Sequence, residues 1–141
     1  MGILAVGWAA VALQARIDAP HRLLERGIRC KDRQQWANAE RLFRRVVTTA
    51  PQSGRAEHAQ YYLGIVSYLQ HRWEDARGAF DWLVTHFPDS RMAAESYYHL
   101  ALCDEALGRR EDMRQALDTL TNEFPQTSWA QAARQRWPNG P

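Results

Sequence analysis

Histidine and cysteine side chains are the residues of this sequence best suited to hold a metal ion or attack a substrate. The five histidines form no H-E-x-x-H pair, and Cys30 and Cys103 stand too far apart for a metal-binding or redox motif. The sequence also lacks a G-x-S-x-G nucleophile motif, a phosphate-binding loop and a G-x-G-x-x-G fingerprint. We therefore expect a protein that is not an enzyme, with no catalytic residue, metal, cofactor or small-molecule substrate.

The remaining chemical groups have structural explanations. The acidic pairs Glu74–Asp75 and Glu111–Asp112 come at the starts of predicted helices, where negative charge is stabilised by the helix dipole. The histidines are expected to be structural or solvated. The two cysteines are expected to be small core residues on helices, with a disulfide or a reactive thiol as the alternative.

Composition places the chain among ordinary soluble globular proteins. Its 141 residues are 45% hydrophobic and 24% charged, which suits one domain with its own core. The formal net charge is only +2, so we expect no nucleic-acid partner.

A 37-residue repeat organises most of the sequence. Pro51, Pro88 and Pro125 stand 37 residues apart, and the segments before them are alike. Other positions recur at the same interval: Gly27, Gly64 and Ala101; Trp36, Trp73 and Arg110; Ala39, Ala76 and Met113; Phe43, Phe80 and Leu117; Ser53, Ser90 and Thr127. Such self-similarity is typical of proteins built from stacked supersecondary units.

Each recurring position has a physical role in a pair of helices. A small residue such as Gly64 lets the first helix approach the second closely, while Phe80 is a large side chain that fills the contact. Each proline ends a second helix, because it cannot donate a hydrogen bond and its ring clashes with the preceding turn. The hydroxyl residue two positions later is placed to N-cap the next helix.

The pattern predicts an all-α fold. No segment alternates with period two, so we expect no sheet. The expected helices cover residues 20–32, 36–49, 54–70, 73–86, 91–107, 111–123 and 127–137.

These features resemble the tetratricopeptide repeat, whose pattern places Leu-Gly on the first helix, Ala-x3-Phe on the second and proline at the end. The second repeat here supplies Leu63-Gly64, Ala76-x3-Phe80 and Pro88. The resemblance implies an α-solenoid of three helix hairpins at about 20–51, 57–88 and 94–125, then a C-terminal capping helix at 127–137. Residues 138–141 would form a tail, and residues 1–19 an apolar N-terminal helix.

The repeat length departs from the usual 34 residues. Together with the F-P-D-S and F-P-Q-T junctions, the longer period resembles a subgroup found in bacterial cell-envelope proteins. That subgroup includes the Tol–Pal-associated periplasmic repeat protein and the lipoprotein of the β-barrel assembly machinery.

Family geometry implies a partner-binding groove lined by the first helix of each pair. Its expected lining is mostly aromatic and aliphatic: Leu24, Ile28, Lys31, Tyr61, Ile65, Tyr68, Tyr98, Leu102 and Glu105. We interpret it as a site for a partner protein's helix or extended peptide, with the alternative that some rings fill space between neighbouring repeats. Related domains hold a chaperone's carboxylate tail with Lys and Asn side chains, but the matching residues here are Leu24, Ile28, Tyr61, Ile65, Tyr98 and Leu102.

The N-terminus carries an uncharged run from Gly2 to Leu13. Its apolar side chains, for membrane insertion or docking, include Ile3, Leu4, Val6, Trp8, Val11 and Leu13. The run is shorter than the roughly 17 residues that a membrane span requires, and no basic residue precedes it as in a signal peptide. Three interpretations stay open: a membrane anchor or interfacial helix, a secretion signal, and a helix packed on the repeats or on a partner.

Taken together, the sequence predicts a non-catalytic scaffold that binds proteins. We expect a bacterial protein that serves as a membrane-associated accessory or assembly subunit of a larger complex. The alternative is a secreted periplasmic assembly factor, and an enzyme or nucleic-acid binder is a remote third. The side of the membrane stays open, because the arginines that follow the apolar run favour a cytoplasmic repeat domain.

Overall fold

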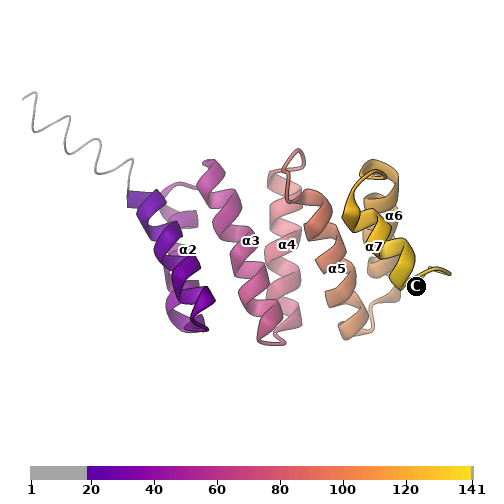
Figure 1. Cartoon of the computed structure of the whole chain (residues 1–141), viewed down its shortest axis with the longest axis horizontal. Coiled ribbons are helices and arrows are strands. Elements are labelled where there is room, and N and C mark those ends of the chain that lie inside the picture. Colours follow the sequence, from indigo (N-terminus) through magenta and orange to yellow (C-terminus); the bar gives the residue numbers. More distant parts are fainter. Residues whose placement is uncertain (1–18, 141) are drawn as a thin grey trace, which may run out of the picture. The chain divides into compact units, whose positions relative to one another are not determined.

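A computed structural model describes residues 19–140, and every element of regular structure in this range is an α-helix. The helices are residues 19–32, α2 (Trp36–Thr49), α3 (Gly54–Leu69), α4 (Trp73–His86), α5 (Ala93–Leu107), α6 (Arg110–Glu123) and α7 (Ser128–Arg136) (Figure 1). The all-α prediction is confirmed for this range, and each helix boundary falls within two residues of the predicted one. Among these residues, no helix combines the length and the hydropathy that crossing a membrane would require.

The chain divides into two compact units, residues 1–59 and 60–141. In the described part of the first unit, residues 19–32 pack on α2. A methyl group added at Gly27 would lie 2.5 Å from a ring atom of Phe43, so only glycine permits this close approach. Phe43 is fully buried, together with Ala39 and Val46.

The second unit repeats this packing and extends it. A methyl group at Gly64 would lie 2.6 Å from a ring atom of Phe80, which confirms the predicted small-against-large contact between α3 and α4. Residues 60–69 of α3 form one layer with α5 and α7, while α4 and α6 form the layer behind them (Figure 1). The core between the layers is aliphatic and aromatic and contains Phe80, Leu83 and Leu120.

The junctions between hairpins follow the predicted proline and hydroxyl pattern. α2, α4 and α6 each end two residues before a proline. The hydroxyl oxygens of Ser53 and Thr127 each accept a hydrogen bond, at 3.2 Å, from the backbone N–H three residues later. Ser90 instead accepts from the N–H of Met92, at 3.0 Å, and α5 accordingly begins at Ala93, two residues later than predicted.

Candidate functional site

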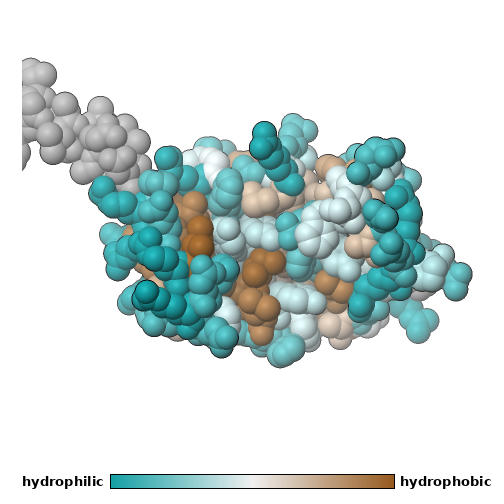
Figure 2. All heavy atoms as spheres, in the orientation of Figure 1, coloured by the Kyte–Doolittle hydropathy of each residue, from teal (hydrophilic) through white to brown (hydrophobic). Residues whose placement is uncertain are grey.

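Six of the nine predicted groove residues lie in the second unit, on α3 and α5. Here we call one part of that surface the tyrosine face, which consists of Tyr61, Ile65, Tyr68, Leu69, Tyr98 and Leu102. Each of these side chains is partly or largely exposed. Figure 2 shows apolar atoms at the surface over the C-terminal parts of α3 and α5. The structure therefore places these predicted residues on one layer of the unit.

Helical spacing explains why α3 carries this face. Tyr61, Ile65, Tyr68 and Leu69 recur at intervals of three and four residues, so they share one side of the helix. An adjoining side of α3 is buried against α4, where Gly64 meets the ring of Phe80. The face is thus held on a rigid helix whose other side belongs to the core.

Tyr61 connects α3 to its neighbours. Its ring lies edge-on to Phe80 on α4, with centroids 6.2 Å apart. Burial, and then hydrogen bonding with the Glu95 carboxylate, raise the pKa of Tyr61 well above its ordinary value. Tyr61 therefore stays neutral at physiological pH.

Tyr68 sits between two further rings. Its centroid lies 5.2 Å from that of Trp73 and 5.3 Å from that of His99, both in edge-to-face geometry. His99 stacks on Phe80, with centroids 5.0 Å apart, and burial lowers the pKa of His99 below its ordinary value. His99 is thus a neutral packing residue beneath the tyrosine face.

Tyr98 and Glu105 are engaged by the C-terminal helix. The ring of Tyr98 lies 5.2 Å from Trp129 and 5.7 Å from Trp137. Glu105 accepts hydrogen bonds from Arg136 Nη2 at 2.7 Å and from Trp137 Nε1 at 2.9 Å. The predicted capping role of α7 is confirmed by these contacts. At the third repeat the structure supports the alternative interpretation, in which the side chains hold neighbouring helices together.

The three predicted groove residues of the first unit are placed differently. Leu24 is 8% exposed and belongs to the buried core, so its predicted exposure to a partner is corrected by the structure. Ile28 and Lys31 are partly exposed, and Lys31 Nζ pairs with Asp32 Oδ1 at 2.6 Å. The predicted N-terminal docking residues from Ile3 to Leu13 lie outside the described part of the chain.

Leu69 was not predicted as a site residue. It is 52% exposed and lies beside the partly exposed Ile65 and Tyr68, and a contiguous apolar patch of this kind marks a candidate interaction surface. Its position four residues after Ile65 is the sequence signal that could have revealed it. The open part of the tyrosine face is therefore Ile65, Tyr68, Leu69 and Leu102.

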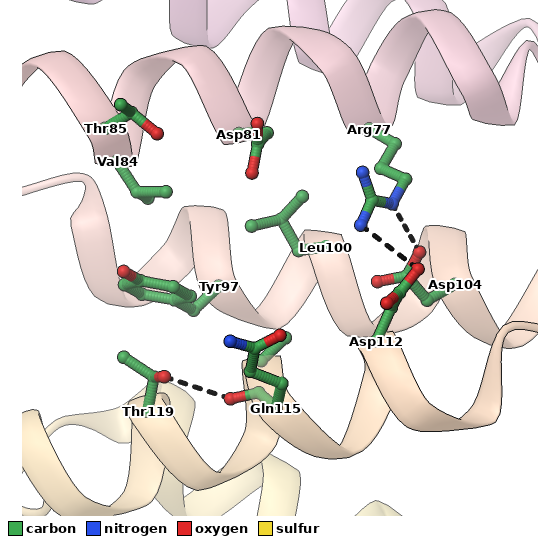
Figure 3. Close-up of a pocket in the computed structure, with 11 residues that line it drawn as sticks. Arg77, Asp81, Val84, Thr85, Tyr97, Leu100, Asp104, Asp112, Gln115 and Thr119 are labelled. Atoms are coloured by element: carbon green, nitrogen blue, oxygen red, sulfur yellow. Dashed lines mark hydrogen bonds and ion pairs between the residues drawn. The ribbon is translucent and has the colours of Figure 1, made fainter.

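A second candidate site is a cavity of about 270 Å³ between α4, α5 and α6 (Figure 3). At one end, Arg77 Nε donates to Asp104 Oδ1 at 2.6 Å, and Arg77 Nη2 lies 3.4 Å from Asp112 Oδ2. Asp104 is only 1% exposed, and this burial raises its pKa against the opposing effect of Arg77. No sequence pattern predicts the cavity, because its walls come from three helices and share no motif.

The described residues offer surfaces for binding. Within residues 19–140, no three or more His, Cys, Asp or Glu side chains gather in a way that could hold a metal ion. Both cysteines are free thiols, Cys103 buried as predicted and Cys30 partly exposed. Burial raises the pKa of the Cys103 thiol to about 12, so that it stays protonated and unreactive at neutral pH.

Comparisons with known proteins agree with this description. The family model of the tetratricopeptide repeat matches residues 58–90 and 95–127, two segments offset by the same 37 residues as the prolines. A solved structure described as the Arabidopsis OM64 TPR domain has a TM-score of 0.72 and 13% identity, covering 87% of this chain and 97% of that one. The MamA RS-1 ArsTM double mutant has a TM-score of 0.67 and 20% identity, covering 91% of this chain and 72% of that one.

A search of curated protein sequences found no match to this chain. Because the structural neighbours share less than 25% identity, they establish the fold alone. Proteins of the tetratricopeptide type generally mediate protein–protein interactions, and the matches indicate no enzyme family. Two segments of the chain thus match the tetratricopeptide repeat, and the chain shares its all-α repeat fold with the two solved structures.

Proposed function

We propose that this chain is a non-catalytic scaffold and that its tyrosine face binds a segment of a partner protein. The observation that carries this proposal is an apolar patch on the surface. Leu69 is 52% exposed, and the neighbouring Ile65 and Tyr68 are partly exposed. Covering these side chains removes apolar surface from water, which favours association by roughly 25 cal/mol per Å². Tyrosine adds a hydroxyl that can hydrogen-bond to the partner's backbone.

The partner segment that suits this face is an amphipathic helix or an extended peptide with apolar side chains. The open residues follow α3 for about one turn and continue to Leu102 on α5, which leaves room for two or three anchoring side chains. The face also rests on rigid helices, so little ordering is required when the partner binds.

Two matched variants test the face. Leu69→Ser removes the exposed apolar side chain and is expected to weaken partner binding roughly tenfold. Trp82→Ala, which removes a partly exposed aromatic of α4 outside the face, is expected to leave the affinity within about twofold. Calorimetry with the purified partner measures both affinities. Equal losses in the two variants would place the binding site elsewhere.

We further propose that the chain works at a membrane, as an accessory or assembly subunit of a larger complex. The support is the uncharged run from Gly2 to Leu13, followed by the arginines Arg16, Arg22 and Arg26. The alternative is a secreted periplasmic assembly factor, supported by the 37-residue period and the F-P junctions. The two proposals differ in the fate of the N-terminus.

The first experiment is an affinity pull-down of the full-length chain from its native membranes, beside a version that starts at Asp18. Recovery of the same partners by both would mean that the repeats specify binding and the N-terminus only localises the protein. Recovery by the full-length chain alone would make the apolar run a docking element. Mass spectrometry of the mature N-terminus then separates the proposals, because cleavage near residues 12–16 is expected only for the secreted factor.

A further inference from the structure

The cavity between α4, α5 and α6 combines an apolar floor with an acidic rim (Figure 3). Val84, Leu100 and Ala116 line its floor and are each between 5% and 7% exposed. The ring of Tyr97 forms one wall, and Thr85, Gln115 and Thr119 contribute polar groups around it. A side chain with an apolar stem and a polar head fits such a lining.

The charges around the cavity favour a cation. Its one basic side chain, Arg77, is already neutralised by the carboxylates of Asp104 and Asp112. Asp81 forms no salt bridge among the described residues, and in Figure 3 its carboxylate points from α4 into the cavity above Leu100. Three carboxylates therefore line the cavity with a single guanidinium, which disfavours an anionic ligand.

The surroundings extend this negative charge. Residues 60–141 contain 11 acidic and 8 basic residues, a formal net charge of −3. Gln115 and Thr119 also line an adjoining hollow on α6, where Arg114 pairs with Glu111 and the carboxylates of Asp118 and Glu123 add negative charge. A basic segment that approaches this side of the unit is therefore attracted before it makes contact.

We propose that this cavity accepts the side chain of an arginine from a basic segment of a partner protein. The aliphatic stem lies on Leu100 and Val84, the guanidinium donates hydrogen bonds to the carboxylate of Asp81, and its plane faces the ring of Tyr97. Arginine fits better than lysine, because a planar guanidinium can stack on the ring while it donates to a carboxylate. This site is separate from the tyrosine face and does not depend on it.

The test is an NMR titration of the ¹⁵N-labelled full chain with N-acetyl-arginine amide. N-acetyl-citrulline amide is the neutral isostere, and N-acetyl-lysine amide tests the preference for a guanidinium. Saturable shifts are expected at the amides of Tyr97, Leu100 and Gln115 with the arginine compound, weaker shifts with the lysine compound, and none with the citrulline compound. Asp81→Asn is expected to weaken arginine binding roughly fivefold. Asp89→Asn makes the same charge change outside the cavity lining and should have no effect.

Several results would overturn the proposal. Equal shifts with the arginine and citrulline compounds would show that charge is not recognised. Equal losses of arginine affinity in Asp81→Asn and Asp89→Asn would show that binding depends on the overall charge of the protein and not on Asp81. A dimer that forms at rising concentration and is lost in Asp81→Asn would assign the cavity to a second copy of this chain. Loss of the arginine-induced shifts in Leu69→Ser would contradict the separation of this site from the tyrosine face.

Discussion

At the residue scale, each hairpin depends on one small residue facing one large ring. Gly64 and Phe80 meet so closely that any side chain at position 64 would overlap the ring. The same pairing of Gly27 with Phe43 shows that this contact is part of the repeat. In the third repeat Ala101 and Leu117 occupy the equivalent positions, so a slightly larger residue meets a smaller partner.

Gly64→Ala is expected to destabilise the protein by about 1–3 kcal/mol, because the added methyl group overpacks the contact with Phe80. The matched control is Gly78→Ala on α4, where a methyl group meets no atom within 4 Å. That substitution is expected to stabilise the helix by up to about 1 kcal/mol. Urea denaturation followed by circular dichroism measures both changes. Similar shifts of the midpoint in the same direction would contradict the packing argument.

At the element scale, the turns inside the hairpins share a backbone feature that the residue types conceal. Gln34, His71 and Gly108 stand 37 residues apart, and all three have φ between 57° and 72°. Only the last is glycine, the residue that adopts this left-handed conformation without strain. The first two turns therefore carry a conformational cost that the third avoids.

Gln34→Gly is expected to stabilise the chain by about 0.5–1 kcal/mol, because glycine removes the strain at φ 57°. Gln35→Gly is the matched control, since Gln35 has φ −84° and gains nothing from glycine. Thermal unfolding of the two variants beside the natural chain gives the comparison. An equal or higher melting temperature for the control would show that the turn is not strained.

The last element, α7, is attached through a titratable group. Hydrogen bonds from Arg136, and then from Trp137, hold the pKa of Glu105 below its ordinary value of 4.5. A lowered pKa in the folded state means that the ionised carboxylate stabilises the fold at neutral pH. This contribution is complete above about pH 4.5 and is lost as the pH falls through the lower folded pKa.

Glu105→Gln is therefore expected to destabilise the protein at pH 7 and to have little effect near pH 3. The indole N–H resonance of Trp137 should move as the natural chain is acidified and stay nearly constant in the variant. NMR and urea denaturation at both pH values check these outcomes. Glu123→Gln on α6 is the control. A Glu105→Gln effect that persisted at pH 3 would contradict a role for the ionised carboxylate.

At the scale of the whole molecule, charge separates along the chain. Residues 1–59 carry 10 basic and 5 acidic residues, a net charge of +5, whereas residues 60–141 carry −3. The small total of +2 conceals this difference. The acidic unit also contains both candidate sites, one apolar and aromatic and one lined by carboxylates.

Salt is expected to affect the two sites differently. Raising the ionic strength from 0.1 M to 1 M shortens the screening length from about 10 Å to about 3 Å. The affinity of N-acetyl-arginine amide for the cavity should then fall roughly threefold or more, because an exposed ion pair is screened. Partner binding at the tyrosine face, which rests on apolar contact, should change by less than about twofold. Titrations at the two salt concentrations test this, and equal salt dependence would contradict the assignment.

The sequence by itself determined the helices, their boundaries and their grouping into hairpins. These features depend on residues close in the chain: prolines that stop helices, hydroxyls that cap them, and small and large residues at fixed spacing. The start of α5, two residues later than predicted, also depends on a nearby residue, because the Ser90 hydroxyl accepts a hydrogen bond from the N–H of Met92. The side of α3 that carries the tyrosine face could also be predicted from the sequence, because helical spacing places Tyr61, Ile65 and Tyr68 together.

Only the tertiary structure decided which of these side chains are free to bind a partner. Leu24 is buried, Tyr98 and Glu105 are engaged by α7, and Leu69 is left exposed. The charged cavity likewise joins Arg77 to Asp104, 27 residues away on another helix. Periodicity tells which side of a helix a residue occupies. Its neighbours across the helix interface depend on how whole helices cross and which rotamers then fit, and that information is spread over the entire core.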